Sequence, residues 1–170
     1  MRKIHKSSLS GLHYAEDKGI DSMYEVKEVK EGRRNYMELL LVADEQEDMI
    51  EKYIDRGEMF VLCDDGAKAA CIVTREGDEV LEIKNLAVLP ACQRLGYGKK
   101  MISFLKKRYQ GRYKFLQAGT GDSPLTVPFY EKCGFCYSHT VENFFTDHYR
   151  NPIIEGGVQL KDMVYFSLRL

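Results

Sequence analysis

The chain has 170 residues, of which 44% are hydrophobic, and a formal net charge of -1 at pH 7. This length and apolar content predict one domain with its own hydrophobic core. The near-neutral charge argues against a nucleic-acid-binding protein, and no apolar run approaches the roughly 20 residues that a membrane helix needs. We therefore expect neither nucleic acid nor a membrane among its partners.

The cysteines and the N-terminal residues indicate the cellular setting and the domain boundary. Five cysteines are an odd number, and the N-terminal segment lacks the apolar core of a secretory signal. This favours a cytoplasmic protein with reduced thiols over a disulfide framework. Residues 1–22 are polar, contain Ser-Ser, Ser-Gly and Lys-Gly pairs and show no periodicity. We expect them to be a mobile leader or extension, and residues 23–170 to form the single domain.

Hydrophobic periodicity predicts strands and helices along this domain. The first segment alternates apolar and polar side chains as a half-buried strand does, whereas residues 92–111 place apolar residues such as Met101 and Leu105 on one helical face and lysines on the other. In chain order we expect strand 23–29, helices 33–45 and 45–57, strands 58–66, 67–77 and 78–89, helix 92–111, strand 113–119, helix 124–134, and strands 135–145 and 158–170, with a loop at 146–157. This order predicts an α/β domain with a mixed sheet.

The stretch NLAVLPACQRLGYGKKM, residues 85–101, places two glycines where a strand gives way to a helix. Gly96 and Gly98 allow positive φ angles and a close approach of backbone N–H groups to a ligand. The N-terminus of a helix has unpaired N–H groups and a partial positive charge, so this turn suits a phosphate-bearing ligand. Arg94 and Lys99 would add positive charge.

Two common phosphate-binding motifs do not fit this turn. A Walker A loop has the pattern Gly-x-x-x-x-Gly-Lys-Ser/Thr. This chain has Gln93 in place of the first glycine and Lys100 in place of the Ser or Thr. The dinucleotide-binding fingerprint Gly-x-Gly-x-x-Gly is incomplete in this chain, because Met101 occupies the position of its third glycine. The pattern Gln/Arg-x-x-Gly-x-Gly/Ala is met by QRLGYG at residues 93–98. A glycine-rich helix start that binds no ligand is the remaining alternative.

Three segments in order resemble the GNAT superfamily of N-acetyltransferases. EIKNLAVLP at residues 82–90 is similar to the family's fourth strand, QRLGYG to its pyrophosphate loop, and FYEKCGF at residues 129–135 to its tyrosine-bearing helix. The late segment, residues 144–168, is also similar to a group of uncharacterised bacterial members. The resemblance covers residues 23–170 and implies a mixed, mostly antiparallel sheet of about seven strands flanked by about four helices.

The resemblance implies acetyl-CoA as co-substrate. In the family, backbone amides of the glycine loop bind the pyrophosphate, and a bulge in the fourth strand splays it from the fifth so that its backbone pairs with pantetheine. Ser123 lies where many members have an asparagine that contacts the cofactor, and this departure leaves the side-chain contact open. The residues that the resemblance assigns to the cofactor are Leu86, Ala87, Val88, Gln93, Arg94, Leu95, Gly96, Tyr97, Gly98, Lys99 and Ser123.

The resemblance also implies two catalytic residues. Acetyl transfer to an amine needs a neutral nucleophile and a proton for the departing thiolate. Tyr130 matches the family's usual general acid, with core packing as its alternative role. Glu82, in a context similar to that of the histone-acetylating members, matches a general base. A water could replace it as the base, and it would then be an ordinary strand glutamate.

Cys133 and Cys136 form a Cys-x-x-Cys pair. A redox role would need this pair at the start of a helix after a strand, and a zinc site would need further Cys or His partners at close spacing. We expect structural cysteines and no metal. His139 and His148 are expected on the surface or in a substrate loop.

The acceptor is expected to approach from the side opposite the cofactor, between the early helices and the late strands. That late region is rich in acidic and aromatic residues, namely Glu142, Asp147, Glu155 and Asp162 with Phe144, Phe145, His148 and Tyr149. Such a pocket suits an amine or polyamine cation, although solvated charge around a loop gives the same pattern. The leading interpretation is N-acetylation of a small primary amine, polyamine or amino acid by direct attack in a ternary complex.

Three other functions are compatible with these residues. A non-catalytic acyl-CoA-binding or regulatory module would share the fold, a nucleotide-binding protein would use only the glycine turn, and a peptide or protein N-acetyltransferase would take a larger acceptor. The sequence leaves open the acceptor, the length of the acyl group and whether the protein forms a homodimer.

Overall fold

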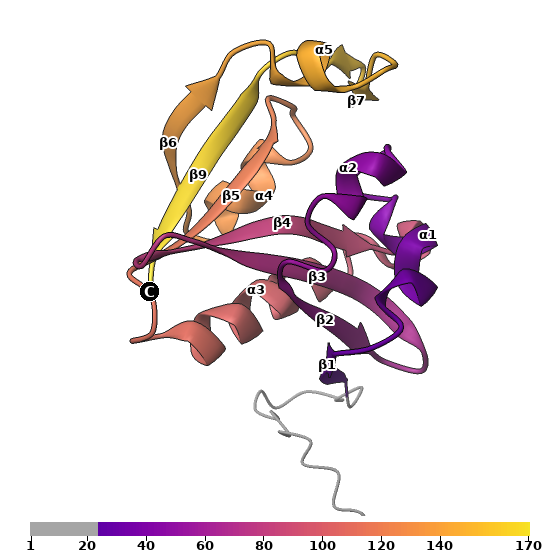
Figure 1. The fold of residues 1–170 in the computed structure, drawn as a ribbon, viewed down its shortest axis with the longest axis vertical. Coiled ribbons are helices and arrows are strands. Elements are labelled where there is room, and N and C mark those ends of the chain that lie inside the picture. The colour runs from indigo at the N-terminus through magenta and orange to yellow at the C-terminus, as the bar shows by residue number, and fades with distance from the viewer. Residues whose placement is uncertain (1–23) are drawn as a thin grey trace, which may run out of the picture.

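The computed structural model of the protein describes residues 24–170. They form a seven-stranded sheet in the order β1-β2-β3-β4-β5-β9-β6 and a separate two-stranded hairpin, β7-β8 (Figure 1). Within the large sheet only β4 and β5 pair in parallel. The expected mixed, mostly antiparallel sheet is therefore confirmed. The prediction for residues 1–22 concerns residues outside the described range.

The elements have the following bounds. The strands are β1 Glu25–Val29, β2 Glu58–Cys63, β3 Ala67–Glu76, β4 Val80–Val88, β5 Phe115–Gly121, β6 Cys136–Val141, β7 Ile154–Glu155, β8 Val158–Gln159 and β9 Met163–Arg169. The α-helices are α1 Met37–Leu40, α2 Glu47–Glu51, α3 Tyr97–Tyr109, α4 Val127–Lys132 and α5 Phe144–His148, and 3-10 turns cover Arg33–Tyr36 and Pro90–Cys92. None of the helices between residues 24 and 170 has the length and apolar character needed to cross a bilayer.

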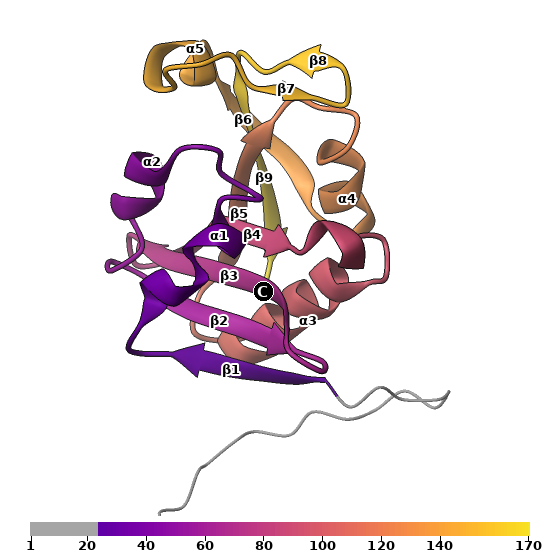
Figure 2. The ribbon, with the colours of Figure 1, turned by 90° about the vertical axis from the view of Figure 1, so that its right-hand side faces the viewer.

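Helices cover both faces of the sheet, with α1 and α2 on one side and α3 and α4 on the other (Figure 2). β2 shows why: its successive side chains point to opposite faces, and both sets are apolar. Phe60 and Leu62 belong to the core on the α3 side, whereas Met59 and Val61 belong to the core on the α1 side, and all four are completely buried. Burial on both faces makes the strand a central layer between two helical layers.

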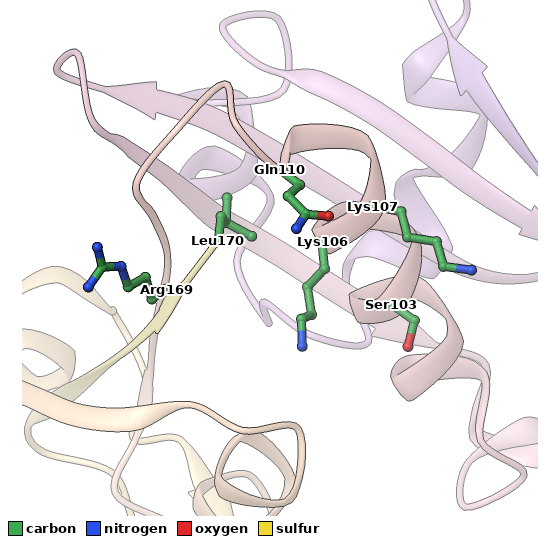
Figure 3. A pocket seen from close by; sticks show the side chains of 6 residues that line it. All are labelled: Ser103, Lys106, Lys107, Gln110, Arg169 and Leu170. Carbon is green, nitrogen blue, oxygen red and sulfur yellow. The ribbon is translucent and has the colours of Figure 1, made fainter.

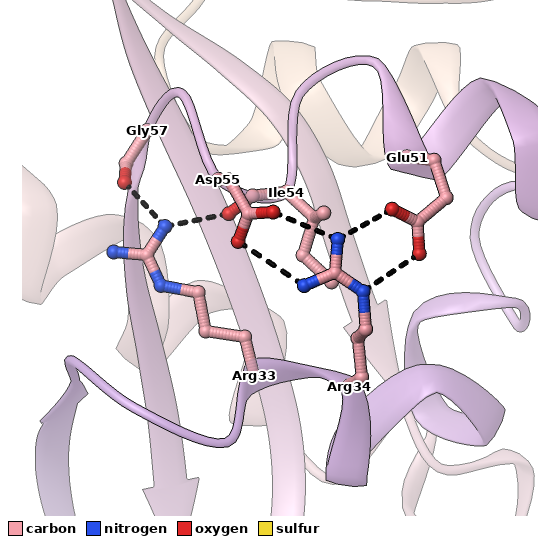
Figure 4. A network of polar contacts seen from close by, with 6 residues as sticks. All are labelled: Arg33, Arg34, Glu51, Ile54, Asp55 and Gly57. Carbon is pink, nitrogen blue, oxygen red and sulfur yellow. Dashed lines mark hydrogen bonds and ion pairs between the residues drawn. The ribbon is translucent and has the colours of Figure 1, made fainter.

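Two neighbouring arginines hold the α1–α2 arm in place (Figure 4). Arg33 donates from Nη1 to the carbonyl oxygens of Ile54, at 2.5 Å, and Gly57, at 2.8 Å. Arg34 pairs with Glu51 at 2.5 Å and with Asp55 at 2.7 Å, and its hydrogen bond lowers the pKa of Asp55. The start of the arm is thus bonded to the segment that follows α2.

All four helical predictions were too long, including the one at 124–134, which is α4 Val127–Lys132. The segment expected as helix 33–45 is a 3-10 turn followed by the short α1, because the Leu40 carbonyl accepts from the Ala43 N–H in a tightened last turn and also from the side chain of Asn85. The helix expected at 45–57 ends as α2 at Glu51. The helix expected at 92–111 begins only at Tyr97, since the left-handed Gly96 precedes it.

The late region also differs from the prediction. Residues 144–145 were expected to continue a strand, but they begin α5, and part of the loop expected at 146–157 forms the rest of α5 and β7. Asn143 has a φ of 56° and turns the chain out of β6, and its N–H donates to Asp162 at 2.7 Å. Phe145 is then buried against Ile153 and Leu160 in a small separate core. This tertiary packing overrides the apolar, strand-like pattern of the segment.

Candidate active site

A bulge opens the sheet between β4 and β5. Ile72 on β3 lies opposite Asn85 and Val73 lies opposite Ile83, so Lys84 has no partner on β3. The parallel pairing of β4 with β5 ends at Ile83 and Ala118, although β4 continues to Val88. Beyond this point the two strands diverge (Figure 1). The predicted bulge is present, and the β4 edge beyond it has no strand partner among the described residues.

The bulge also sorts the side chains of β4 between the two faces. Leu86 and Val88 pack with the core on the α3 side. Asn85 and Ala87 face the opposite side, where Ala87 joins the α1–α2 core. Beyond the bulge, β4 thus presents side chains to both faces of the sheet.

The glycine loop lies directly after this open edge. Arg94 has a φ of 63° and Gly96 a φ of 88°, so that two left-handed residues curl the backbone before α3. A Cβ on Gly96 would meet nothing within 4 Å, so it is the backbone conformation that requires glycine here. No side chain caps α3, and its first N–H groups stay available for an anion. Gln93 donates to the Val88 carbonyl at 3.3 Å and joins the loop to β4.

Gly98 has a different reason to be glycine. A Cβ at this position would lie 3.1 Å from the Phe129 ring and 3.7 Å from Val88. The missing side chain lets the first turn of α3 pack directly against α4 and β4. Tyr97, beside it, donates its hydroxyl to Asp64 at 2.7 Å and so fixes the loop to the β2–β3 turn.

Tyr130 lies on α4 and is only 7% exposed. Its ring contacts Phe129, Phe135 and Phe166 at centroid distances of 5.2, 5.4 and 6.3 Å. Burial raises the pKa of Tyr130, and the nearby Cys71, Cys133 and Glu155 raise it further. The phenol therefore keeps its proton at neutral pH. No hydrogen bond between residues 24 and 170 engages its hydroxyl.

Glu82 lies one residue before the last paired position of β4 and β5 and is 6% exposed. One carboxylate oxygen pairs with the Lys84 ammonium at 2.7 Å, and the other accepts from Gln117 Nε2 at 3.2 Å. The bulge residue itself thus supplies the cation that compensates this buried carboxylate. A proton can reach Glu82 only at the expense of this ion pair.

Ser123 is buried at the start of the α4 segment. Its Oγ accepts from the N–H groups of Leu125, at 3.1 Å, and Thr126, at 3.3 Å. The hydroxyl is therefore engaged in shaping the β5–α4 turn. A contact between this side chain and the cofactor stays a prediction.

All five cysteines are free thiols. Burial raises the pKa of Cys133, although Lys99 and Lys106 act in the opposite direction. Cys136 is exposed on β6 rather than at the start of a helix, so the pair lacks the setting of a redox motif. Within residues 24–170 no group of three or more His, Cys, Asp or Glu side chains could hold a metal ion.

A shallow cavity of about 300 Å³ lies away from the opening (Figure 3). Its lining comes from the second half of α3 and the end of β9: Ser103, Lys106, Lys107, Gln110, Arg169 and Leu170. Arg169 pairs with Phe115 at the start of β5, whereas β5 leaves β4 after Ala118. None of the predicted site residues lines this cavity, so the β4–β5 opening is the better candidate site.

Sequence reasoning missed a polar cluster on the α1–α2 side of the opening. Asn85, Tyr53 and Asp44 are joined by hydrogen bonds, and Tyr149 reaches Asp44 from 105 residues further along the chain. The one available signal was Asn85, a polar residue within the apolar run NLAVL. Of the late residues singled out for the acceptor, Asp162 and His148 bond locally to Asn143 and Phe144.

Comparison with known proteins identifies the family. The family model described as an acetyltransferase (GNAT) domain matches residues 55–136. The uncharacterized N-acetyltransferase YvbK of Bacillus subtilis is 32% identical over 136 residues, which cover 78% of this chain and 88% of that protein. This chain belongs to the GNAT family of N-acetyltransferases.

Solved structures of family members have the same architecture. A GNAT family acetyltransferase from Elizabethkingia anophelis with acetyl-CoA bound is 29% identical, with a TM-score of 0.82 over 86% of this chain and 98% of that one. An acetyltransferase of Bacillus subtilis in complex with CoA is 29% identical, with a TM-score of 0.78 over 86% of this chain and 99% of that one. An IAA acetyltransferase from Bacillus cereus has a TM-score of 0.80 at 28% identity, over 86% of this chain and 99% of that one.

Proposed function

We propose that this N-acetyltransferase moves the acetyl group of acetyl-CoA to the primary amine of a small molecule, by direct attack in a ternary complex in the cytoplasm. The observation that supports this most is the unpaired edge of β4 beyond Lys84, with the left-handed glycine loop at its end. Because β4 presents side chains to both faces of the sheet here, donor and acceptor would meet across its backbone without a covalent intermediate on the protein.

Acetyl-CoA would lie on the α3–α4 side of the opening. The backbone of Leu86, Ala87 and Val88 offers the N–H and C=O groups that would pair with pantetheine. The loop residues would then bind the pyrophosphate through backbone amides and added charge: Gln93, Arg94, Leu95, Gly96, Tyr97, Gly98 and Lys99. Ser123 would border this arm through the turn that it shapes.

Tyr130 would act as the general acid. The amine nitrogen attacks the thioester carbonyl carbon, the C–S bond breaks, and the thiolate that leaves takes the phenolic proton. The proton is present before the reaction, as in any tyrosine at neutral pH, and the raised pKa by itself makes the phenol a weaker acid. The hydroxyl has no hydrogen bond within residues 24–170 that would compete with the thiolate.

Glu82 would accept the proton that the amine loses. Its place one residue before the last paired position of β4 and β5 supports this role. The ion pair with Lys84 must loosen as Glu82 is protonated, and an ordered water between amine and carboxylate would serve equally well.

Contacts between two chain segments bridge the α1–α2 side of the opening, where the acceptor would lie. This favours a small acceptor over a peptide or protein. Tyr149 donates to Asp44, and Arg150 pairs with Asp48 at 2.5 Å while its N–H donates to Gln46 at 3.0 Å. These contacts join the α1–α2 arm to the segment after α5. An extended peptide would have to pass across these bonds, whereas a small amine would not.

The first experiment is calorimetric titration of the protein with acetyl-CoA, CoA and ADP, followed by an amine screen with thiol-release detection. We expect tight binding of acetyl-CoA, weaker binding of ADP and turnover of small amines. Binding of CoA with acetylation of peptides only would contradict the small acceptor. Binding with no turnover at all would indicate a non-catalytic acyl-CoA-binding module.

Assembly into a homodimer stays a prediction. β6 is an edge strand of the sheet, and all six of its residues are exposed. An open edge of this kind can pair with a second copy. Light scattering coupled to size-exclusion chromatography would give the oligomeric state directly.

A further inference from the structure

A half-buried carboxylate lies on the acceptor side of the opening. Asp44 follows α1, and its two oxygens each accept a phenolic hydrogen bond at 2.9 Å, Oδ2 from Tyr53 and Oδ1 from Tyr149. Tyr53 belongs to the segment after α2, whereas Tyr149 comes from the segment after α5. The carboxylate is therefore held in one orientation from both sides.

No cation of residues 24–170 compensates the charge of Asp44. Burial raises its pKa, while the hydrogen bonds from Tyr53 and Tyr149 lower it. Asp48, four residues later, is paired with Arg150 at 2.5 Å, but no Lys, Arg or His between residues 24 and 170 forms an ion pair with Asp44. A partly buried carboxylate that is bonded only to neutral donors is stabilised further by a cation.

The same cluster contains an unused acceptor. Asn85 is 3% exposed, and its Nδ2 donates to the Leu40 carbonyl at 3.0 Å and to the Tyr53 hydroxyl at 3.1 Å. Its carbonyl oxygen Oδ1 is buried and makes no hydrogen bond within the described chain. Buried polar atoms rarely lack a partner, and such an atom next to a functional site points to a missing donor.

Asn85 places this cluster near the reaction. It is the first residue beyond the bulge on β4 and precedes Leu86, whose backbone would meet the thioester. Two successive hydrogen bonds, of 3.1 and 2.9 Å, lead from its amide through Tyr53 to Asp44. Asp44 is thus linked through one side chain to the residue that precedes Leu86.

We propose that Asp44, Tyr53, Tyr149 and Asn85 form a subsite for a second cationic group of the acceptor, which makes the preferred acceptor a linear diamine or polyamine. This inference rests on the proposed function of the opening. The Asp44 carboxylate would pair with the distal ammonium of the acceptor, and the rings of Tyr53 and Tyr149 would flank that ammonium. The Asn85 carbonyl oxygen would accept a hydrogen bond from an N–H of the same acceptor. The reacting amine would remain uncharged at the thioester.

The test is calorimetric titration of the CoA-saturated full-length protein with linear diamines of three to six carbons and with monoamines of the same length. A hydrogen-bonded charge pair contributes about 1.5–3 kcal/mol, so at least one diamine should bind roughly tenfold or more tightly than its monoamine. Asp44→Asn should remove that preference and leave CoA binding unchanged. Glu45→Gln, which removes an exposed negative charge one residue away, should retain it.

The outcomes separate this inference from the proposed function. Equal binding of diamines and monoamines by the wild-type protein, or an equal loss of both in D44N, would overturn the subsite, even where acetyl-CoA still binds and monoamines are still acetylated. Absence of acetyl-CoA binding would overturn the proposed function itself, and the subsite with it. The comparison on the wild-type protein needs no variant, so a D44N protein that failed to fold would still leave the subsite open to refutation.

Discussion

The substitution Tyr130→Phe separates the catalytic role of this residue from its packing role. Phenylalanine keeps the ring contacts with Phe129, Phe135 and Phe166 and removes only the hydroxyl. That hydroxyl has no hydrogen bond within residues 24–170, so its removal leaves no buried partner unsatisfied. The variant is therefore a change of chemistry with almost no change of packing.

Two magnitudes follow from this geometry. Because the hydroxyl has no hydrogen bond within residues 24–170 to lose, Y130F should match the wild-type protein in stability to within about 1 kcal/mol. Loss of a general acid lowers the rate by about 100-fold or more. We expect kcat to fall by that factor while the Kd of acetyl-CoA stays unchanged.

The assay combines thiol-release kinetics with urea denaturation and calorimetric titration of acetyl-CoA. Tyr109→Phe is the matched control, because Tyr109 is also completely buried but lies at the C-terminal end of α3. It should leave kcat unchanged. A kcat of Y130F within about threefold of wild type would refute the acid role, since proton transfer would contribute far more than that.

Three further predictions concern other parts of the molecule. Gly96→Ala should lower the free energy of unfolding by about 1–2 kcal/mol, because alanine is strained at a φ of 88°, and should weaken CoA binding; unchanged values in denaturation and titration would show that the loop adapts. Glu82→Gln should lower kcat/KM by about 100-fold or more, because glutamine cannot accept the proton, whereas an unchanged kcat/KM would assign the proton to water. The free energy of unfolding should fall as the pH rises from about 10 to about 12, because burial raises the pKa of Tyr165 to about 12 while an unfolded tyrosine titrates near 10. Below that window both states carry the proton and this contribution is constant, so equal stability at pH 8 and pH 11 in urea titrations would contradict the raised pKa.

The sequence by itself determined the order of most strands and helices and the place of the glycine loop, whereas the number and pairing of the strands came from the family resemblance. Alternation of side chains is a local property of a strand, and the apolar stripe of α3 repeats within a few turns, so both can be read from neighbouring residues. The conformational freedom of Gly96 and Gly98 is equally local. The motifs around Glu82, Gly96 and Tyr130 lie in the order that the family resemblance requires.

The tertiary structure decided the contacts between segments that are distant in the sequence. The bulge at Lys84 depends on the register between β3 and β4, and the short helix α5 depends on the burial of Phe145 by residues that follow it. The cluster at Asp44 joins residues as far apart as Asp44 and Tyr149. The spacing of these two residues in the sequence does not predict their contact, because the hydrogen bond forms only once the folded sheet has brought the segments of Asp44 and Tyr149 together.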